Sequence, residues 1–351
     1  EENINPALFG IPIKDHKKPT ILHLYAKPIS SGASVAGKNV PKEIALTNLG
    51  HGVFSGTISA SGMIGLILHA YDQQDAATNN NGIYRIEQFV NDTVTYDFTI
   101  DRVAFSDFRY LIAHIDFERY KKTGIMAHKC YLEPGNKLPS YSSVINQGLL
   151  DVKAGSKKQV TLLVYDSWGT KSEIRLTVTG EEFTAMQDAT VTKMDWQSAH
   201  TIKIDGVKIY LPPATLYKDE DIKVTTKPAC GICETSIYQV GERTIPAHAR
   251  YTISIHKDQL KSQEKMVWAV VNSSGNGSGL TSVWDGDWLN ASPREFGTFA
   301  VMQDNNPPIL TVNGFANGKI VKKGGRVSMT AKDYLSGITS YEATIDGNWV
   351  L

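Results

Sequence analysis

The sequence lacks the features of membrane-spanning and nucleic-acid-binding proteins. Its 351 residues contain no apolar run approaching the ~18 residues that a membrane-spanning helix needs. Its 36 basic residues are balanced by 36 acidic ones, so no net charge favours an anionic polymer or an anionic membrane. We therefore expect no nucleic-acid partner and no membrane-spanning segment.

The sequence also lacks the motifs of common catalytic sites. The nine histidines form no HxH, HExxH or HxxxD pattern, and no serine lies in a GxSxG elbow. The stretch "GASVAGKN" (32–39) approaches a phosphate-binding loop. However, it ends in Asn39 where the magnesium-binding hydroxyl should be, and Pro41 follows where a helix should propagate. We expect no catalytic residue and no metal centre in this chain.

Cysteine is scarce, and two of the three cysteines form a single CxxC pair, Cys230 and Cys233. A zinc site would need a second ligand pair, which is missing. A thioredoxin-like motif would open a helix, but strand-like segments flank this pair on both sides. The alternatives left are a local disulfide at a strand turn and two ordinary thiols.

What the sequence has in abundance is the two-residue alternation of half-buried strands, as in "QVTLLVYD" and "EIRLTVTG". The pattern predicts an all-β protein of tandem immunoglobulin-like β-sandwich modules with one short helical insertion. The first sandwich is predicted over residues 15–182, with its insertion at 103–150. A second sandwich-like domain is predicted over 198–303, where Asp205-Gly206 favours a tight hairpin.

The insertion contains a helix-like stretch that starts after Ser106, which is a suitable N-cap, and ends at Gly124. Lys121 and Lys122 lie near its C-terminus. A strand is the alternative. The predicted inner face of the helix consists of Phe108, Leu111, Ile112 and Ile115.

The last residues repeat an earlier part of the chain. With Gly82 set against Gly337, the positions that follow agree at a constant offset, and "AYD" from Ala70 matches "AKD" from Ala331. The segments "KKPTILHLYA" from Lys17 and "NPPILTVNGF" from Asn306 also match. Such self-similarity indicates a modular β protein. We expect residues 304–351 to be the first strands of a third, truncated immunoglobulin-like module, which cannot bury a core of its own.

Two short stretches are candidate ligand sites. The loop "DQQDAATNNNG" is rich in oxygen ligands, so Asp72, Asp75 and Asn79 could hold a cation, although the loop lacks EF-hand spacing and also fits a solvated turn. "WDGDW" offers Trp284 and Trp288 as a sugar-binding surface. An Asp285-Gly286 turn would pair Trp284 with Asp287 and place the two indoles on opposite faces.

Several of these segments together resemble the accessory region of lysostaphin/LytM-type zinc peptidases from Gram-negative envelopes. The resemblance rests on "NPALFGIPIKDHKKPTI" (5–21), "GIYRIEQFVND", "RYLIAHIDFERYKKTG", "CYLEPGNKLPSY", "REFGTFAV" and "SGITSYEATIDGNWVL". It implies that residues 1–14 are the tail of a preceding peptidase domain. The family's zinc ligands, an HxxxD pair and the second His of HxH, match no position of this chain.

The resemblance implies a role without catalysis for this chain. It would be the accessory or docking region of a cell-envelope metallopeptidase that cuts peptidoglycan cross-links, and the zinc would lie in the upstream catalytic domain. The expected partners are that domain and peptidoglycan, with outer-membrane proteins as further candidates. The expected location is the periplasm or the outer membrane, where a Cys230–Cys233 disulfide would be favoured and Cys130 would stay unpaired. The alternatives are a scaffold subunit of an outer-membrane complex and a carbohydrate-binding module.

Overall fold

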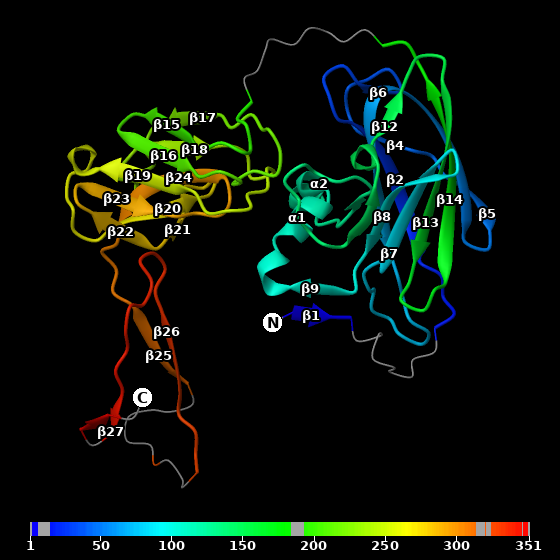
Figure 1. The fold of residues 1–351 in the computed structure, drawn as a ribbon. Helices are drawn as coiled ribbons and strands as arrows, with labels where there is room; N and C mark the ends of the chain where they lie inside the picture. The colour runs from blue at the N-terminus through cyan, green and yellow to red at the C-terminus, as the bar shows by residue number, and fades with distance from the viewer. Residues whose placement is uncertain are drawn as a thin grey trace. The chain divides into compact units, whose positions relative to one another are not determined.

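The protein is all-β, as the alternating pattern predicts, and forms two compact units (Figure 1). The computed structural model describes residues 2–5, 15–183, 193–313, 320, 324–345 and 347–349. Unit 1 comprises the chain up to Lys193 together with Leu216–Asp219, and unit 2 comprises the remainder. Among the described residues, no helix is long and apolar enough to cross a membrane. Most of the predicted tail 1–14, including its "PALFG" stretch, lies outside the described residues.

Unit 1 contains one extended sheet system whose main strand order is β11-β8-β7-β13-β14-β6-β2-β4. Its strands are β1 (Glu2–Ile4), β2 (Thr20–Pro28), β3 (Ser34–Val35), β4 (Lys42–Glu43), β5 (Thr47–Gly50), β6 (Val53–Tyr71), β7 (Arg85–Val90), β8 (Thr93–Thr99), β9 (Arg102–Ala104), β10 (His128–Lys129), β11 (Tyr141–Val144), β12 (Leu150–Val152), β13 (Lys157–Tyr165) and β14 (Lys171–Gly180). Apart from the β1–β9 pair, all of these strands belong to this system.

Strand β6 connects the two layers of this sandwich. Over Val53–Ala60 it pairs in parallel with β14, and over Ile64–Tyr71 it pairs antiparallel with β2. Between these stretches, Gly62 has φ +71°, a conformation that residues with a side chain rarely adopt. A Cβ atom on Gly62 would also come within 3.1 Å of Ala33. The strand therefore changes partners at a position that favours glycine.

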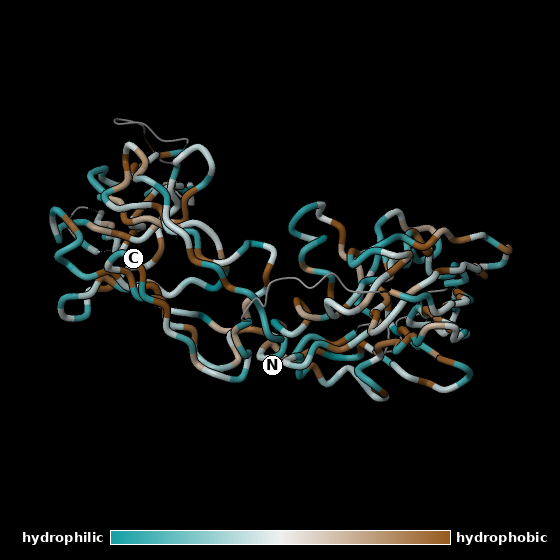
Figure 2. Tube along the Cα trace, turned by 90° about the horizontal axis from the view of Figure 1, so that it is seen from above, coloured by the Kyte–Doolittle hydropathy of each residue, from teal (hydrophilic) through white to brown (hydrophobic). Residues whose placement is uncertain are grey.

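The core of unit 1 follows directly from the alternation in the sequence. On β13 and β14 every second side chain is buried, among them Val160, Leu162, Ile174 and Leu176. These side chains pack against buried residues of β2 and β6 in one cluster. Polar and apolar residues accordingly interleave along the strands, as the colours of Figure 2 show.

The helical insertion differs from the single helix that the sequence predicts. A 3₁₀ turn at Phe105–Asp107 precedes two short helices, α1 (Tyr110–His114) and α2 (Phe117–Thr123). The helix breaks because Ile115 is extended and forms a β-bridge with His128. The amide of Asp116 donates to the backbone oxygen of Ala127 at 2.8 Å.

Of the two predicted ends of that helix, the structure has only the C-terminal one. The side chain of Ser106 makes no capping hydrogen bond, so the predicted N-cap is wrong. Phe108, which the sequence pattern predicts on the inner face, is instead 50% exposed. The predicted stop at Gly124 is confirmed, since Gly124 is left-handed with φ +75° and its amide donates to Tyr120.

The rest of the insertion returns to the sheets. Strands β10 and β12 pair with β6, and β11 pairs with β8, so the insertion adds edge strands to the sandwich. A buried ion pair between Lys129 Nζ and Glu133 Oε1, 2.7 Å apart, fixes the loop after β10. Lys129 Nζ also donates to the backbone oxygen of Ala113.

Unit 2 contains a second sandwich of two five-stranded sheets, β15-β16-β19-β23-β22 and β17-β18-β24-β20-β21. The strands are β15 (His200–Ile204), β16 (Val207–Leu211), β17 (Val224–Lys227), β18 (Ile237–Val240), β19 (Thr252–His256), β20 (Met266–Val271), β21 (Gly277–Gly279), β22 (Ser282–Asp285), β23 (Trp288–Ala291) and β24 (Gly297–Gln303). The predicted Asp205-Gly206 hairpin is confirmed: both residues have positive φ, and Ile204 pairs with Val207.

The centre of this second sandwich is aromatic. Trp268 is fully buried, and its indole N–H donates to the backbone oxygen of Leu289 at 2.9 Å. Tyr251 stacks on Phe296 with ring centres 5.0 Å apart. The hydrogen bond of Trp268 satisfies the one polar atom that its burial would otherwise leave without a partner.

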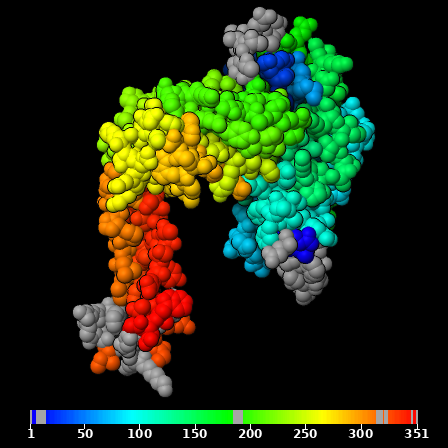
Figure 3. Space-filling model, turned by 60° about the vertical axis from the view of Figure 1, so that its left-hand side comes forward, coloured from blue at the N-terminus to red at the C-terminus, as the bar shows by residue number. Residues whose placement is uncertain are grey.

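The remaining strands of unit 2 reproduce the pairing of the first module. They are β25 (Ile309–Asn313), β26 (Ser328–Lys332), β27 (Thr344–Ile345) and β28 (Asn348–Trp349). In unit 1 Ile21 pairs with Ala70, and the matching Leu310 pairs with Ala331. All residues of β25 and β26 are exposed, and the orange and red residues are visible at the surface in Figure 3.

The second hairpin of the repeat is reproduced as well. Val90 pairs with Thr93 in unit 1, and Ile345 pairs with Asn348 at the same offset. The repeat found in the sequence therefore specifies the same strand register twice.

Replacement of Gly62 tests the bend in β6. Gly62→Ala should lower the free energy of unfolding by roughly 1–2 kcal/mol, because alanine at positive φ is strained. Gly82→Ala is the control, since Gly82 has ordinary backbone angles and no atom near its missing Cβ. Urea unfolding of both variants measures the difference, and equal stabilities would contradict the account.

Candidate functional site

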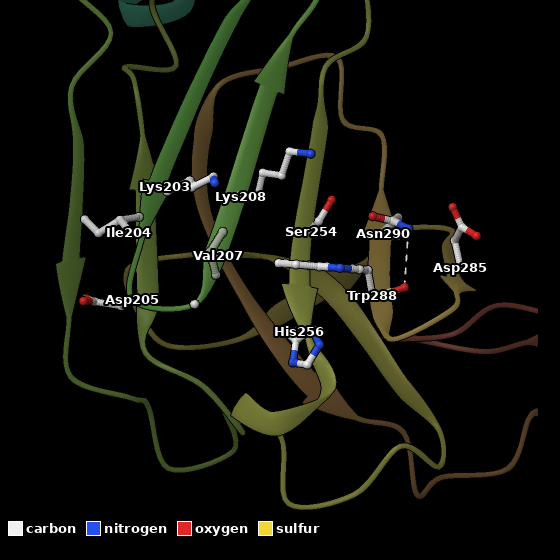
Figure 4. A pocket seen from close by; sticks show the side chains of 11 residues that line it. Lys203, Ile204, Asp205, Val207, Lys208, Ser254, His256, Asp285, Trp288 and Asn290 are labelled. Atoms are coloured by element: carbon white, nitrogen blue, oxygen red, sulfur yellow. Dashed lines mark hydrogen bonds between the residues drawn. The ribbon is translucent and has the colours of Figure 1, made fainter.

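The best candidate site is the exposed face of the sheet β15-β16-β19-β23-β22 in unit 2. The opposite face of this sheet packs into the core through Ile209, Ile253, Ile255 and Leu289. Because side chains alternate along a strand, the intervening residues must point outward. These outward residues line a pocket of about 600 Å³ (Figure 4). We call this surface the platform.

The platform is organised in rows that cross the strands. Lys203 pairs with Lys208, Lys208 with Ser254, and Ser254 with Asn290, so these four side chains lie side by side. In the next row, His256 pairs with Trp288 and Trp288 with Asp285. The register therefore places two cations beside an aromatic ring and several hydrogen-bonding groups.

Trp288 is the central side chain of the platform. It is 36% exposed, and its ring meets that of His256 edge-on at 5.1 Å. In Figure 4 the indole extends from β23 across β19, between Ser254 and His256. Asn290 Nδ2 donates to the backbone oxygen of Trp288 at 3.4 Å, which leaves the amide oxygen of Asn290 for a ligand.

Some basic side chains on and beside the platform form salt bridges and others do not. At its edge, Lys257 Nζ lies 2.7 Å from Asp287 Oδ1, and this pairing raises the pKa of Lys257. Lys203 and Lys208 form no salt bridge with any described residue. Their ammonium groups are therefore available to an anionic ligand.

The register of "WDGDW" differs by one residue from the prediction. Trp284 pairs with Leu289 rather than with Asp287, and Asp285 pairs with Trp288. The turn thus lies at Gly286 and Asp287, and Gly286 has φ +56°. The two indoles still face opposite sides of the sheet: Trp284 shares a face with buried Leu289, and only Trp288 lies on the platform.

The cation candidates of the Asp72 loop do not converge. Asp75 Oδ2 lies 2.8 Å from His16 Nδ1, and the amide of Asn79 donates to Asn81 at 3.5 Å. The carboxylate of Asp72 instead lies with those of Asp15 and Asp166, and one oxygen of each lies within 4.8 Å of the other two. We call these three residues the aspartate cluster. Burial, followed by the charges of the other two carboxylates, raises the pKa of Asp72 to about 6.

Cys230 and Cys233 form a disulfide in the structure. Both pack against a cluster of buried residues of β20 and β24. Cys130 is a free and buried thiol, and burial raises its pKa to about 12. The thiol of Cys130 is therefore a poor nucleophile at neutral pH.

A pair of histidines lies beside a pocket of about 590 Å³ in unit 1. His114 Nε2 and His128 Nδ1 are 2.9 Å apart, and His114 stacks on Phe98. Burial lowers the pKa of His128 to about 4, with a further contribution from His69. Burial lowers the pKa of His114 well below 6.5, assisted by His128 and Lys129.

Sequence reasoning missed Lys203, Lys208, Ser254, His256 and Asn290. The tight hairpin at Asp205-Gly206 could have placed Lys203 opposite Lys208, because a two-residue loop fixes the register. The pairing of β16 with β19 and of β19 with β23 leaves no local signal, since these strands are far apart in the sequence.

One match to a known protein family covers the second sandwich. Residues 191–304 match the family described as Zu5-like domain. This segment takes in the predicted domain 198–303 and carries every residue of the platform. No curated protein matches the chain.

The histidine pair should make unit 1 less stable in mild acid. The ordinary pKa of histidine is about 6.5 and the folded-state values are lower, so the unfolded chain takes up protons first. The contribution of the pair to the free energy of unfolding should therefore fall as pH decreases from about 6.5 towards about 4, while the raised pKa of Asp72 acts in the opposite direction. Urea titrations across this range should give a smaller slope of the free energy of unfolding against pH for His128→Gln than for the wild-type chain. An equal slope in His128→Gln would contradict this assignment.

Proposed function

We propose that this chain is a non-catalytic binding region whose platform holds a glycan-containing polymer. One observation carries the proposal: a single exposed sheet face combines an aromatic ring, two unpaired lysines and several hydrogen-bonding side chains. The apolar face of a sugar ring stacks on an indole, and its hydroxyls suit Ser, Asn and His partners. Carboxylates on the polymer would suit Lys203 and Lys208.

Peptidoglycan is the polymer that fits this chemistry best, because it carries both sugar rings and peptide carboxylates. The choice agrees with the resemblance to LytM-type zinc peptidases. In that setting, the chain is the accessory region of a cell-envelope enzyme that cuts peptidoglycan cross-links in the periplasm or at the outer membrane. Its role is to hold the substrate near an upstream catalytic domain, which supplies the zinc.

Co-sedimentation with purified peptidoglycan tests the proposal. The chain should bind, and Trp288→Ala should weaken binding roughly tenfold through loss of ring stacking. Lys208→Ala should weaken binding less, and its effect should diminish as salt screens the carboxylates. Trp349→Ala is the matched control, because Trp349 is 69% exposed but lies outside the platform.

Two results would contradict the proposal. One is peptidoglycan binding that is unchanged in the Trp288→Ala/Lys208→Ala double variant. The other is an absence of binding combined with stoichiometric recovery of envelope proteins on the immobilised chain, which would favour the scaffold alternative.

A further inference from the structure

The aspartate cluster brings together three carboxylates from distant parts of unit 1. Asp15 precedes β2, Asp72 directly follows β6, and Asp166 directly follows β13. They meet where β2 begins, β6 ends and β13 turns towards β14. All three are more than nine-tenths buried, with exposures of 8%, 4% and 1%.

Their hydrogen bonds leave two oxygens without a partner. Asp166 accepts three hydrogen bonds, from the amides of Trp168 and Thr170 and from the Thr170 hydroxyl, and one of its four lone-pair sites remains open. Asp15 Oδ1 accepts from the amide of Lys17, but Asp15 Oδ2 and Asp72 Oδ1 are buried and accept no hydrogen bond in the described structure. A buried carboxylate oxygen without a donor costs free energy, so these two atoms indicate a missing ligand.

Among the described residues, no basic side chain forms an ion pair with the cluster. The charge of Lys17 acts to lower the pKa of Asp72, but Lys17 Nζ donates to the backbone oxygen of Gln74 at 3.2 Å. Carboxylates this close repel one another, and burial strengthens the repulsion.

We propose that Asp15, Asp72 and Asp166 bind a calcium ion. Calcium accepts carboxylate oxygens at about 2.3–2.6 Å, so two ligands of one ion are at most about 5 Å apart. The 4.8 Å limit within the cluster satisfies this condition. Magnesium demands ligands at about 2.0–2.1 Å in strict octahedral geometry, and zinc prefers nitrogen and sulfur, which the cluster lacks.

The third module provides an internal comparison. Asp304 and Asp333 stand where Asp15 and Asp72 stand in the first module. There the backbone supplies the donors: Asp304 accepts from the amides of Asn306 and Ser336, and Asp333 accepts from Leu335 and Gly337. The two aspartates of the third module thus accept hydrogen bonds from backbone amides, whereas Asp15 Oδ2 and Asp72 Oδ1 of the first module accept none.

The bound ion would join three separate segments at one end of the sandwich. It would tie the segment before β2 to the end of β6 and to the β13–β14 turn. Asp72 also lines the pocket of about 590 Å³ in unit 1. Calcium binding should therefore stabilise unit 1 by mass action.

Calorimetry and thermal unfolding of the whole chain, first stripped with EDTA, test this site. CaCl₂ should bind with one ion per chain and raise Tm as its concentration increases. Asp72→Asn should raise Tm in EDTA, because it removes a repulsive charge, and should weaken calcium binding about tenfold or more. Asp15→Asn should weaken binding in the same way and serves if Asp72→Asn does not fold.

Terbium luminescence localises the ion. Tb³⁺ should compete with Ca²⁺ and be sensitised by Trp168, which lines the same pocket as Asp72. Trp168→Phe should reduce the luminescence without changing calcium affinity, and Asp75→Asn should change neither. The site is refuted if the stripped wild-type chain binds no calcium, or if Asp72→Asn and Asp15→Asn bind as tightly as the wild type. These readouts do not involve the platform, so the two proposals can fail independently.

Discussion

A sheet in a two-layer sandwich can bury only one of its faces, and this constraint underlies the whole structure. Isoleucine and leucine side chains of β16, β19 and β23 fill the inner face in unit 2. The intervening residues must then meet solvent, and among them Lys208 and Trp288 form the platform. The same alternation that builds the core therefore also determines which side chains can meet a ligand.

The sequence predicts the fold well wherever the signal is local or repeated. The Asp205-Gly206 hairpin needs only two residues to fix its register, and the structure has it. The repeat also predicts pairing between residues that are far apart in the sequence. Ile21 pairs with Ala70, and the aligned residues Leu310 and Ala331 pair in the same way. Two copies of one pattern adopt one strand register.

Predictions fail where distant segments decide the outcome. The helix after Ser106 breaks at Ile115, because that residue is drawn into a bridge with a strand that comes later in the chain. The "WDGDW" hairpin shifts by one residue, so that Trp284 pairs with Leu289 rather than with Asp287. The aspartate cluster could not be predicted from Asp72 alone, since its other members lie far away in sequence. At each of these positions, contacts with other segments of the chain override the structure that the local sequence favours.

We propose that the ligand binds on one face of one sheet in unit 2. The most direct test is hydrogen–deuterium exchange of the whole chain with and without a soluble glycan–peptide fragment of peptidoglycan. Saturating fragment should slow exchange in β16, β19 and β23 while leaving β18 and β24 of the opposite sheet unchanged. Protection that appears elsewhere in the chain and spares these three strands would contradict the central claim.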